Sequence, residues 1–307
     1  MQFAQRLEAL STNVFADMDR AKAMALGSGS KIIDLSLGSS DLPAEPKAIA
    51  AIKNALEDRN THGYLLYNGT KSFREAAANW YTAKFGIAVN PETEVLQLIG
   101  SQEGTAHLPL AILNPGDVAL LQDPGYPSHA GGVYLAGGQV YPMPLLAENQ
   151  FLPILADIPA SVSTAAKMMV LNYPHNPTGA IASLDFFKQV VTFCRQHDLI
   201  LVHDFPYVDL VFGNDGLSGN TNSMTPSILQ ADPHKELSVE FFTMSKSYNM
   251  GGFRVGYAIG NAQIIKALRQ VKAVIDFNQY QGILNGALAA LSGSHDSVSY
   301  THLTLPT

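Results

Sequence analysis

The sequence predicts an α/β protein with a mainly parallel central sheet and helices on both faces. Short apolar runs typical of buried strands alternate with longer segments in which apolar residues recur every three or four positions, as on one face of a helix. Such alternation favours parallel pairing, because parallel neighbours need a crossover helix between them. At 307 residues, 47% of them hydrophobic, the chain can bury a large core.

Two helices are predicted first. Residues 46–58 have proline at the start, where its missing N–H is tolerated, and apolar residues at Ile49, Ile52 and Leu56. Residues 72–85 have the pattern of an alanine-rich amphipathic helix.

A strand, a turn and a helix come next. Residues 95–99 are typical of a strand, and a glycine-bounded turn leads into a helical pattern that continues to Leu113. A helix N-terminus offers free N–H groups and the positive end of the helix dipole, so the turn at Ser101 and Gln102 is a natural phosphate seat. The alternative is an ordinary strand-to-helix turn with a serine cap.

The remaining elements repeat this alternation. Residues 117–121 form a short strand that ends at a turn before Tyr126, an aromatic whose plainer role is packing. Residues 168–171 and 200–202 are brief apolar runs, with a helical pattern at 184–197 between them. Cys194 falls on the buried face of that helix, so it is interpreted as a core residue rather than a nucleophile.

Three polar clusters follow strand-like runs: Asn176-Pro177-Thr178-Gly179, Asp204-Phe205-Pro206-Tyr207, and Ser245-Lys246 with Arg254. Each alone has a plainer explanation, as a turn, a helix cap or a solvated lysine. In a parallel sheet, however, the carboxyl ends of the strands share one edge, where ligands bind. The clusters together supply an amine, a carboxylate, a phenol, an amide and a guanidinium, which suits a pyridine aldehyde phosphate.

The tetrapeptide Thr243-Met244-Ser245-Lys246 and the segment Gly252-Phe253-Arg254-Val255-Gly256 also match a known pattern. With the clusters above, they make the chain resemble the class I/II pyridoxal-phosphate-dependent aminotransferases, of the aspartate aminotransferase fold (fold type I). The similarity runs from about residue 36 to about residue 291.

The resemblance implies the cofactor pyridoxal 5'-phosphate and a role for each site residue. Lys246 would form the Schiff base and later move the proton, and Asp204 would pair with the pyridine nitrogen. Tyr207 and Asn176 would bind the phenolic oxygen of the ring, and Tyr126 would stack on it. The other residues implied are Arg254, Thr243, Ser101 and Gln102 at the phosphate, Gly38 and Asn176 at the substrate, and Tyr64, which would reach the phosphate of a neighbouring subunit in a homodimer.

The resemblance also implies a domain organisation. Residues 1–45 would be the N-terminal segment of a small domain, residues 46–275 the large cofactor-binding domain, and residues 276–307 the start of the C-terminal small domain. Family members continue for roughly another hundred residues, a domain-scale segment that includes an arginine for the substrate α-carboxylate. The tail at 300–307 looks foreign to the family, so a truncated or misassembled chain is expected.

The implied reaction moves an amino group between an amino acid and a 2-oxo acid. Residues 276–280, Asp-Phe-Asn-Gln-Tyr, are expected where a loop of the partner subunit approaches the cleft. They would either bind a polar substrate or merely pack in a dimer interface. A lyase or synthase on the same fold is an alternative. A non-catalytic regulator is disfavoured, because only about thirty residues, without a basic face, precede the region of similarity that starts near residue 36, too few for a DNA-binding helix-turn-helix.

Composition narrows the remaining classes. The net charge of −7 and the lack of a long basic run argue against nucleic acid, and no stretch of about 18 apolar residues suggests a membrane span. One cysteine permits no internal disulfide, which favours the cytoplasm. The nine histidines lack metal-ligand spacing; His175 and His203, next to two of the clusters, are interpreted as packing or supporting residues.

Overall fold

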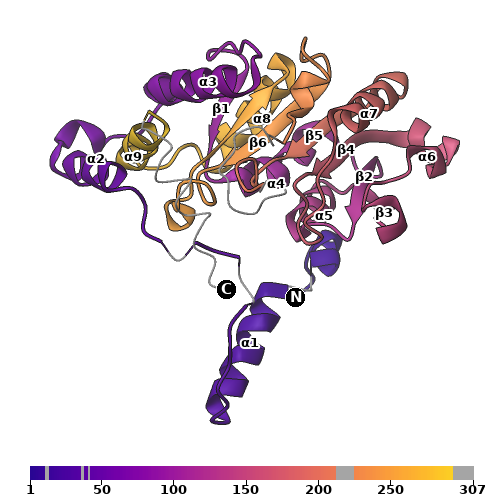
Figure 1. Cartoon of the computed structure of the whole chain (residues 1–307), viewed down its shortest axis with the longest axis horizontal. Helices are drawn as coiled ribbons and strands as arrows, with labels where there is room; N and C mark the ends of the chain where they lie inside the picture. Colours follow the sequence, from indigo (N-terminus) through magenta and orange to yellow (C-terminus); the bar gives the residue numbers. More distant parts are fainter. Residues whose placement is uncertain (11–13, 36–37, 41, 212–224, 293–307) are drawn as a thin grey trace.

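The computed structural model describes residues 1–10, 14–35, 38–40, 42–211 and 225–292. Within these residues, a seven-stranded sheet of order β1-β7-β6-β5-β4-β2-β3 forms the centre of the molecule (Figure 1). The strands are β1 (Val95–Leu98), β2 (Val118–Asp123), β3 (Gln139–Pro144), β4 (Ala166–Asn172), β5 (Ile200–Asp204), β6 (Ser238–Thr243) and β7 (Gly256–Gly260). The β2–β3, β2–β4, β4–β5 and β5–β6 pairs are parallel, and β7 runs antiparallel to β1 and β6. The prediction of a mainly parallel sheet is confirmed.

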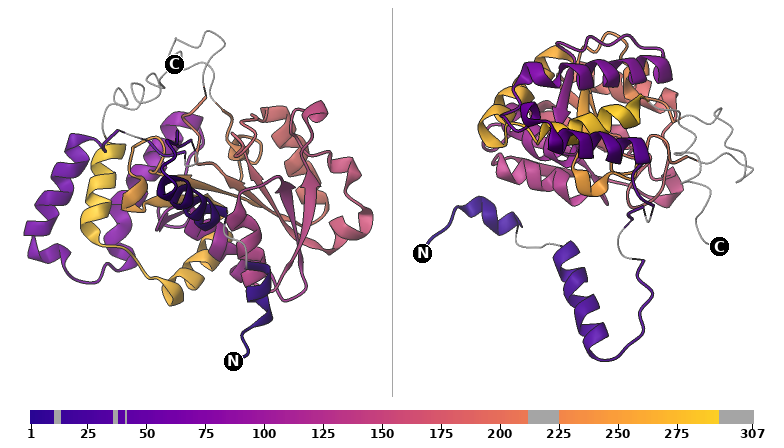
Figure 2. Two further views of the ribbon diagram at one scale, coloured as in Figure 1. Left: turned by 90° about the horizontal axis from the view of Figure 1, so that it is seen from below. Right: turned by 90° about the vertical axis from the view of Figure 1, so that its left-hand side faces the viewer.

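Helices cover both faces of the sheet, as predicted (Figure 2). The α-helices are α1 (Val14–Gly27), α2 (Pro46–Glu57), α3 (Lys71–Phe85), α4 (Ser101–Ile112), α5 (Pro127–Leu135), α6 (Ala160–Ala165), α7 (Leu184–Gln196), α8 (Ala262–Ile275) and α9 (Gln281–Leu291). Helices α4, α5 and α8 share one apolar core with one face of the strands. Helices α3, α7 and α9 share a second core with the other face, and α2 packs on α9.

Alternation along each strand divides its side chains between these cores. In β1, for example, Val95 belongs to the core of α3 and α7, whereas Leu96 and Leu98 belong to the core of α4 and α8. Because both faces are buried, the strands appear in the sequence as continuous apolar runs.

The register of the central strands brings their carboxyl ends together. Asn172 at the end of β4 pairs with Asp204 at the end of β5, and Asp204 pairs with Phe241 of β6. Thr243, the last residue of β6, lies two residues further along. The polar clusters of the sequence therefore meet at one edge of the sheet.

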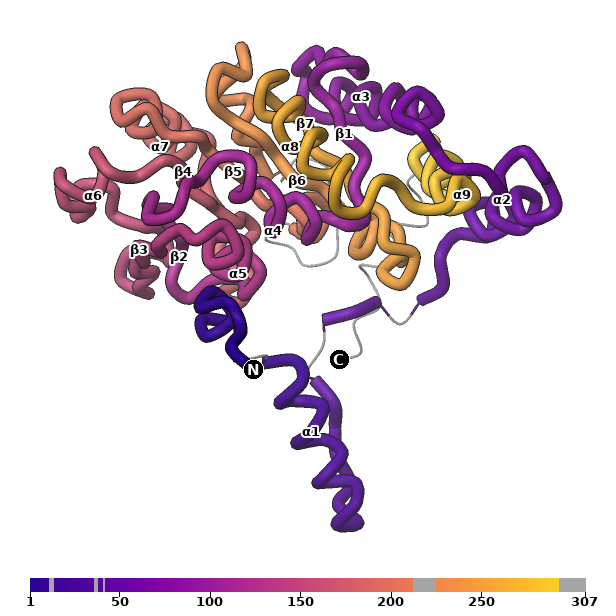
Figure 3. Tube along the Cα trace, turned by 180° about the vertical axis from the view of Figure 1, so that it is seen from behind, coloured from indigo at the N-terminus to yellow at the C-terminus, as the bar shows by residue number. Residues whose placement is uncertain are grey.

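The N-terminal segment packs on the body of the molecule through its first residues, whereas helix α1 lies apart from it. The 3-10 helix η1 (Gln5–Leu10) packs on α5, where the Arg6 guanidinium donates to the Leu135 carbonyl. Helix α1 then projects away from the body, and none of its residues is buried (Figures 1 and 3). The chain returns across the carboxyl edge of the sheet, where the carbonyl of Pro43 accepts the Asn249 side chain.

The predicted elements all occur, with shifted ends. Strands β4 and β5 continue into Asn172 and Asp204, beyond their apolar runs, because these polar side chains are buried and hydrogen bonded at the sheet edge. Cys194 is buried in the core, as predicted, and burial raises the pKa of its thiol. Residues 212–224 and the tail beyond residue 292 lie outside the described residues. None of the described helices is long and apolar enough to cross a membrane.

Candidate active site

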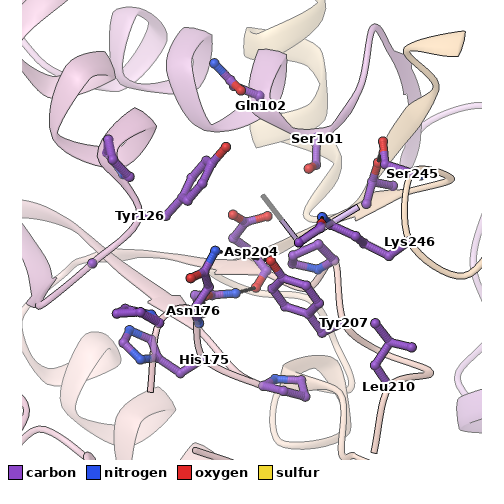
Figure 4. A pocket seen from close by; sticks show the side chains of 18 of the residues that line it. Ser101, Gln102, Tyr126, His175, Asn176, Asp204, Tyr207, Leu210, Ser245 and Lys246 are labelled. Atoms are coloured by element: carbon purple, nitrogen blue, oxygen red, sulfur yellow. Dashed lines mark hydrogen bonds between the residues drawn. The ribbon is translucent and has the colours of Figure 1, made fainter. Parts of the chain in front are cut away.

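A cavity of about 740 Å³ opens at the carboxyl ends of β4, β5 and β6. Figure 4 shows Tyr126, Asn176, Tyr207 and Lys246 gathered around Asp204. The predicted site residues that line the cavity are Gly38, Ser101, Gln102, Tyr126, Asn176, Asp204, Tyr207, Thr243, Lys246 and Arg254. The fold therefore brings together ten of the eleven residues predicted from the sequence.

Asp204 lies at the base of the cavity with one carboxylate oxygen satisfied and one not. Its Oδ2 lies 3.0 Å from Nε2 of His129, and both side chains are buried. Its Oδ1 is also buried but has no hydrogen-bond partner in the described part of the chain. A buried carboxylate oxygen without a donor is costly. The geometry thus fits a ligand that brings an N–H donor to Oδ1, as a protonated pyridine ring does.

The backbone around Asp204 is fixed by two amides. Asn172 donates from Nδ2 to the Asp204 carbonyl at 2.8 Å, and its Oδ1 accepts the backbone N–H of Asn176 at 2.8 Å. Gln122 of β2 accepts the backbone N–H of Asn172 at 2.6 Å. These bonds link the ends of three adjacent strands and hold the loop after β4 in place.

Asn176 and Tyr207 come from different loops and meet in the cavity. The Asn176 amide donates to the Tyr207 hydroxyl at 3.2 Å. Burial raises the pKa of Tyr207, so its hydroxyl stays protonated and can donate to a ligand oxygen. The pair can hold one oxygen atom of a bound ring.

Lys246 follows β6 and points into the same cavity. Its ammonium donates to the Gly38 carbonyl at 2.5 Å and lies 5.6 Å from the centre of the Tyr207 ring. Burial lowers the pKa of Lys246, which increases the neutral, nucleophilic fraction of its amine at a given pH.

The first turn of α4 and Arg254 form the cationic end of the cavity. Ser101 and Gln102 are the first two residues of α4, so their backbone N–H groups precede the first helical hydrogen bonds. The Arg254 guanidinium runs directly past Gly100: a Cβ there would lie 2.5 Å from an Arg254 terminal nitrogen. Gly100 also has a φ of 77°, which favours glycine. This combination of helix N-terminus and arginine suits a phosphate.

Thr243 and Tyr126 complete the walls. The Thr243 hydroxyl lies 2.9 Å from the Ser245 hydroxyl and accepts the Ser245 backbone N–H, which orders the turn before Lys246. Tyr126 packs edge-on against His129 at 6.0 Å between ring centres, and burial raises the pKa of its phenol. Phe15 of α1 lies 6.4 Å from the Tyr126 ring and also lines the cavity.

Two histidines next to the clusters have different positions. His175 lines the cavity and pairs with the Thr178 hydroxyl at 2.8 Å, and burial lowers its pKa to about 4. It is therefore neutral near pH 7. His203 is fully buried beside Glu240 of β6, 2.8 Å from that carboxylate, in the core of α3 and α7. It is not among the residues that line the cavity.

Tyr64 is the one predicted site residue outside the cavity. Its side chain is 92% exposed and packs edge-on against Phe277. This position agrees with the expectation that it would serve another subunit, and it leaves that role a prediction.

Sequence reasoning missed His129, Asn172 and Phe15. A signal for His129 was present: Pro127 is typical of the first helical position, so residue 129 falls in the first turn of a helix that begins beside Tyr126. Asn172 ends the apolar run of β4 directly, four residues before Asn176.

Comparison with known proteins is consistent with this geometry. A model of the family described as "Aminotransferase class I and II" matches residues 30–302. An LL-diaminopimelate aminotransferase of Syntrophobacter fumaroxidans is 43% identical over 295 residues, which cover 96% of this chain and 74% of that protein. The LL-diaminopimelate aminotransferase of Aquifex aeolicus is 39% identical over 297 residues, 97% of this chain and 75% of the relative.

Two solved structures have a fold similar to that of this chain. A probable N-succinyldiaminopimelate aminotransferase from Thermus thermophilus superimposes with a TM-score of 0.88 at 41% identity, over 94% of this chain and 76% of that one. Substrate-bound BacF from Bacillus subtilis has a TM-score of 0.88 at 32% identity, over 98% of this chain and 75% of that one. This chain therefore spans about three quarters of the length of these relatives.

Proposed function

Because the chain belongs to the class I and II aminotransferases, which are pyridoxal-phosphate-dependent transaminases, we propose that its cavity transfers an amino group from a diaminopimelate-type amino acid to a 2-oxo acid. One observation carries the chemistry: Asp204, whose buried Oδ1 has no hydrogen-bond partner among the described residues, lines the same cavity as Lys246. A covalent attachment point and a buried carboxylate that lacks a donor are what this cofactor needs.

The residues present fit the cofactor along its whole length. We assign the phosphate to the N-terminus of α4 and Arg254, the pyridine nitrogen to Asp204, and the phenolic oxygen to Asn176 and Tyr207. When bound, pyridoxal phosphate supplies an aldehyde that captures amines and a ring that withdraws electrons from the substrate. The remaining steps depend on the protein.

Asp204 controls the charge of the ring nitrogen. A carboxylate at hydrogen-bond distance favours the protonated form of that nitrogen and so maintains electron withdrawal. His129 occupies Oδ2, so Oδ1 is the carboxylate oxygen that we assign to the ligand. Asn172 donates to the Asp204 carbonyl and so holds the backbone from which the carboxylate projects.

Lys246 moves the proton. Once the substrate amine has taken its place, the freed Lys246 amine is the base for the substrate Cα proton, and its lowered pKa provides the neutral form. The half-buried site limits water, which strengthens the electrostatic interactions inside it. The protonated Lys246 would then be placed to deliver that proton away from Cα, and water would have to cleave the carbon–nitrogen bond to release the 2-oxo acid.

The proposed substrate class rests on the relatives. Proteins named for diaminopimelate or N-succinyldiaminopimelate match this chain at 39–43% identity over at least 94% of its length. In the cavity, Lys246 and Arg254 are the lysine and arginine side chains among the described lining residues, and both are assigned to the cofactor. The carboxylates of the substrate therefore require cationic or amide groups besides Lys246 and Arg254. The polar segment 276–280 does not line the cavity of its own chain, so we propose that it would contribute from a second subunit.

We also infer a homodimer. Tyr64 is 92% exposed and Val274 is 86% exposed, and Phe277 lies against Tyr64. Large exposed apolar side chains close together are typical of an interaction surface. A second copy that covers this surface would direct Tyr64 to the neighbouring cavity. The single buried thiol, Cys194, fits a reducing compartment, so we propose the cytoplasm.

A donor panel in single half-reactions tests the proposed reaction. Purified protein loaded with pyridoxal phosphate is mixed with LL-diaminopimelate, N-succinyl-LL-diaminopimelate, aspartate or lysine. We expect a diaminopimelate donor to convert the bound cofactor fully to its amine form and to release one equivalent of 2-oxo acid. Release of ammonia with the aldehyde form retained would instead support a lyase and overturn the proposal.

A further inference from the structure

A buried group of charged side chains lies behind the first turn of α4 and has no part in the proposed reaction. Glu103 of α4 is 7% exposed and Lys272 of α8 is 3% exposed. The Lys272 ammonium contacts both Glu103 carboxylate oxygens, at 2.9 and 3.0 Å, and donates to the Asp276 carboxylate at 2.9 Å. The pair joins two helices that pack on each other.

Glu103 holds the corner of the chain at which the proposed phosphate seat begins. It is the third residue of α4, and its Oε2 accepts the backbone N–H of Ile99 at 2.5 Å. This bond bridges the corner of Gly100 and Ser101. Because Arg254 passes directly beside Gly100, any shift of the corner also moves the guanidinium.

The position of Glu103 poses an electrostatic problem. A carboxylate in the first turn of a helix is favoured by the helix dipole, but it repels a phosphate bound at the same end. Lys272 offsets this charge from the side opposite the cavity. Burial raises the pKa of Glu103 to about 7, and the Lys272 ammonium opposes that rise. The other titratable groups that face Glu103 are Asp276 and His107, whose Nδ1 lies 4.0 Å from Glu103 and 3.8 Å from Asp276; burial lowers the pKa of His107 and so favours its neutral form.

The Lys272 ammonium also holds Asp276, the first residue of a second segment that lies beside the proposed phosphate site. Asp276 caps α8 and begins the segment in which Gln279 donates to the carbonyls of Leu98 and Arg254 at 3.4 Å. Lys272 therefore contacts Glu103, which holds the corner before α4, and Asp276, which begins the segment after α8.

We propose that Lys272 is a positioning residue of the phosphate seat that acts through Glu103. It neutralises the Glu103 carboxylate and holds the corner at Gly100 in the shape that accepts a phosphate. The inference rests on the assignment of the phosphate to α4 and Arg254 under the proposed function.

The test compares pyridoxal 5'-phosphate with pyridoxal, which lacks the phosphate. Dissociation constants of both are measured by absorbance on the apoprotein at pH 7 and pH 9. For Lys272→Met we expect the affinity for pyridoxal phosphate at pH 9 to fall ~10- to 100-fold, while the affinity for pyridoxal changes less than ~3-fold. The loss is smaller at pH 7, because Glu103 without its counter-charge takes up a proton there.

Second-site and control variants separate this role from simple destabilisation. Glu103→Gln added to Lys272→Met removes the uncompensated charge and keeps an acceptor for Ile99, so affinity is expected to recover to within ~5-fold and to lose its pH dependence. Lys266→Met alters an exposed lysine of the same helix and is expected to change neither affinity. Equal losses for both ligands, or no recovery in the double variant, would overturn the inference.

Two further variants complete the test. Arg254→Gln tests the proposed phosphate site directly. If this variant keeps the preference for pyridoxal phosphate over pyridoxal, the assignment of the phosphate to Arg254 under the proposed function is wrong. If Arg254→Gln removes the preference but Lys272→Met does not, the present inference alone fails. Should Lys272→Met not fold, Lys272→Gln takes its place; it removes the charge but keeps a hydrogen-bond donor, and a loss confined to pyridoxal phosphate is again expected.

Discussion

The imidazole Nε2 of His129 lies 3.0 Å from Oδ2 of Asp204, and both side chains are buried. A carboxylate only accepts hydrogen bonds, so Nε2 carries the hydrogen and donates. Helix α5 thereby fixes a strand residue 75 positions away in the chain. The other oxygen, Oδ1, has no hydrogen-bond partner in the part of the chain that the structure describes, and it is the atom that we propose for the cofactor.

Replacement of Asp204 by alanine tests the role of the carboxylate. We expect cofactor to bind weakly and turnover to fall by ~10³-fold or more, because the ring nitrogen loses the group that keeps it protonated. His129→Ala should cost less, ~10- to 100-fold, since it acts through Asp204. Steady-state kinetics of both variants at saturating cofactor measure this. A near-normal rate for Asp204→Ala would exclude the assignment.

The covalent attachment point is Lys246 in our proposal. Borohydride reduction of the loaded protein followed by peptide mass spectrometry should find the cofactor on Lys246, and Lys246→Ala should abolish the adduct. Lys235, whose ammonium is paired with Glu94 at 3.3 Å, provides a matched control in Lys235→Ala. An unchanged adduct in Lys246→Ala would place the linkage elsewhere.

How far the sequence predicts this site depends on the range of the contacts. Asp204, Tyr207, Asn176 and Lys246 were predicted because each belongs to a recognisable short pattern that follows an apolar run. The contact of His129 with Asp204 is non-local, so no periodicity or short motif reports it.

The same limit applies to the fold. Alternating strands and helices predict the parallel part of the sheet, but β7 pairs antiparallel with β1 and β6, and strand order depends on long-range pairing. The ends of β4 and β5 were predicted too early, because Asn172 and Asp204 are polar. Their burial depends on partners in other strands and helices, which hydropathy does not register.

The lowered pKa of Lys246 predicts how cofactor attachment depends on pH. The pKa lies below the ordinary value of about 10.5 because burial disfavours the charged ammonium. The neutral amine is the nucleophile, so attachment of pyridoxal phosphate to apoprotein should accelerate as pH rises and level off above the lowered pKa. Stopped-flow absorbance between pH 6 and pH 10 follows this rate. A midpoint at or above the ordinary lysine value would contradict the burial of the amine.

The exposed position of Tyr64 leads to a prediction about subunits. If Tyr64 acts in the neighbouring cavity, Tyr64→Ala and Lys246→Ala are each defective alone but complement each other when mixed. Random pairing makes half of the dimers mixed, and each mixed dimer holds one site with both residues intact. About a quarter of wild-type activity should therefore return after denaturation and refolding together.

The control for this experiment pairs two defects of one site. Lys246→Ala mixed with Arg254→Gln leaves a defect in both cavities of every mixed dimer, because both residues line the cavity of their own chain. No activity should return in that mixture. Tyr64 differs because its side chain is 92% exposed and lies outside the cavity of its own chain, against Phe277. If the mixture of Tyr64→Ala and Lys246→Ala stays inactive, or light scattering finds an active monomer, Tyr64 does not serve a second subunit.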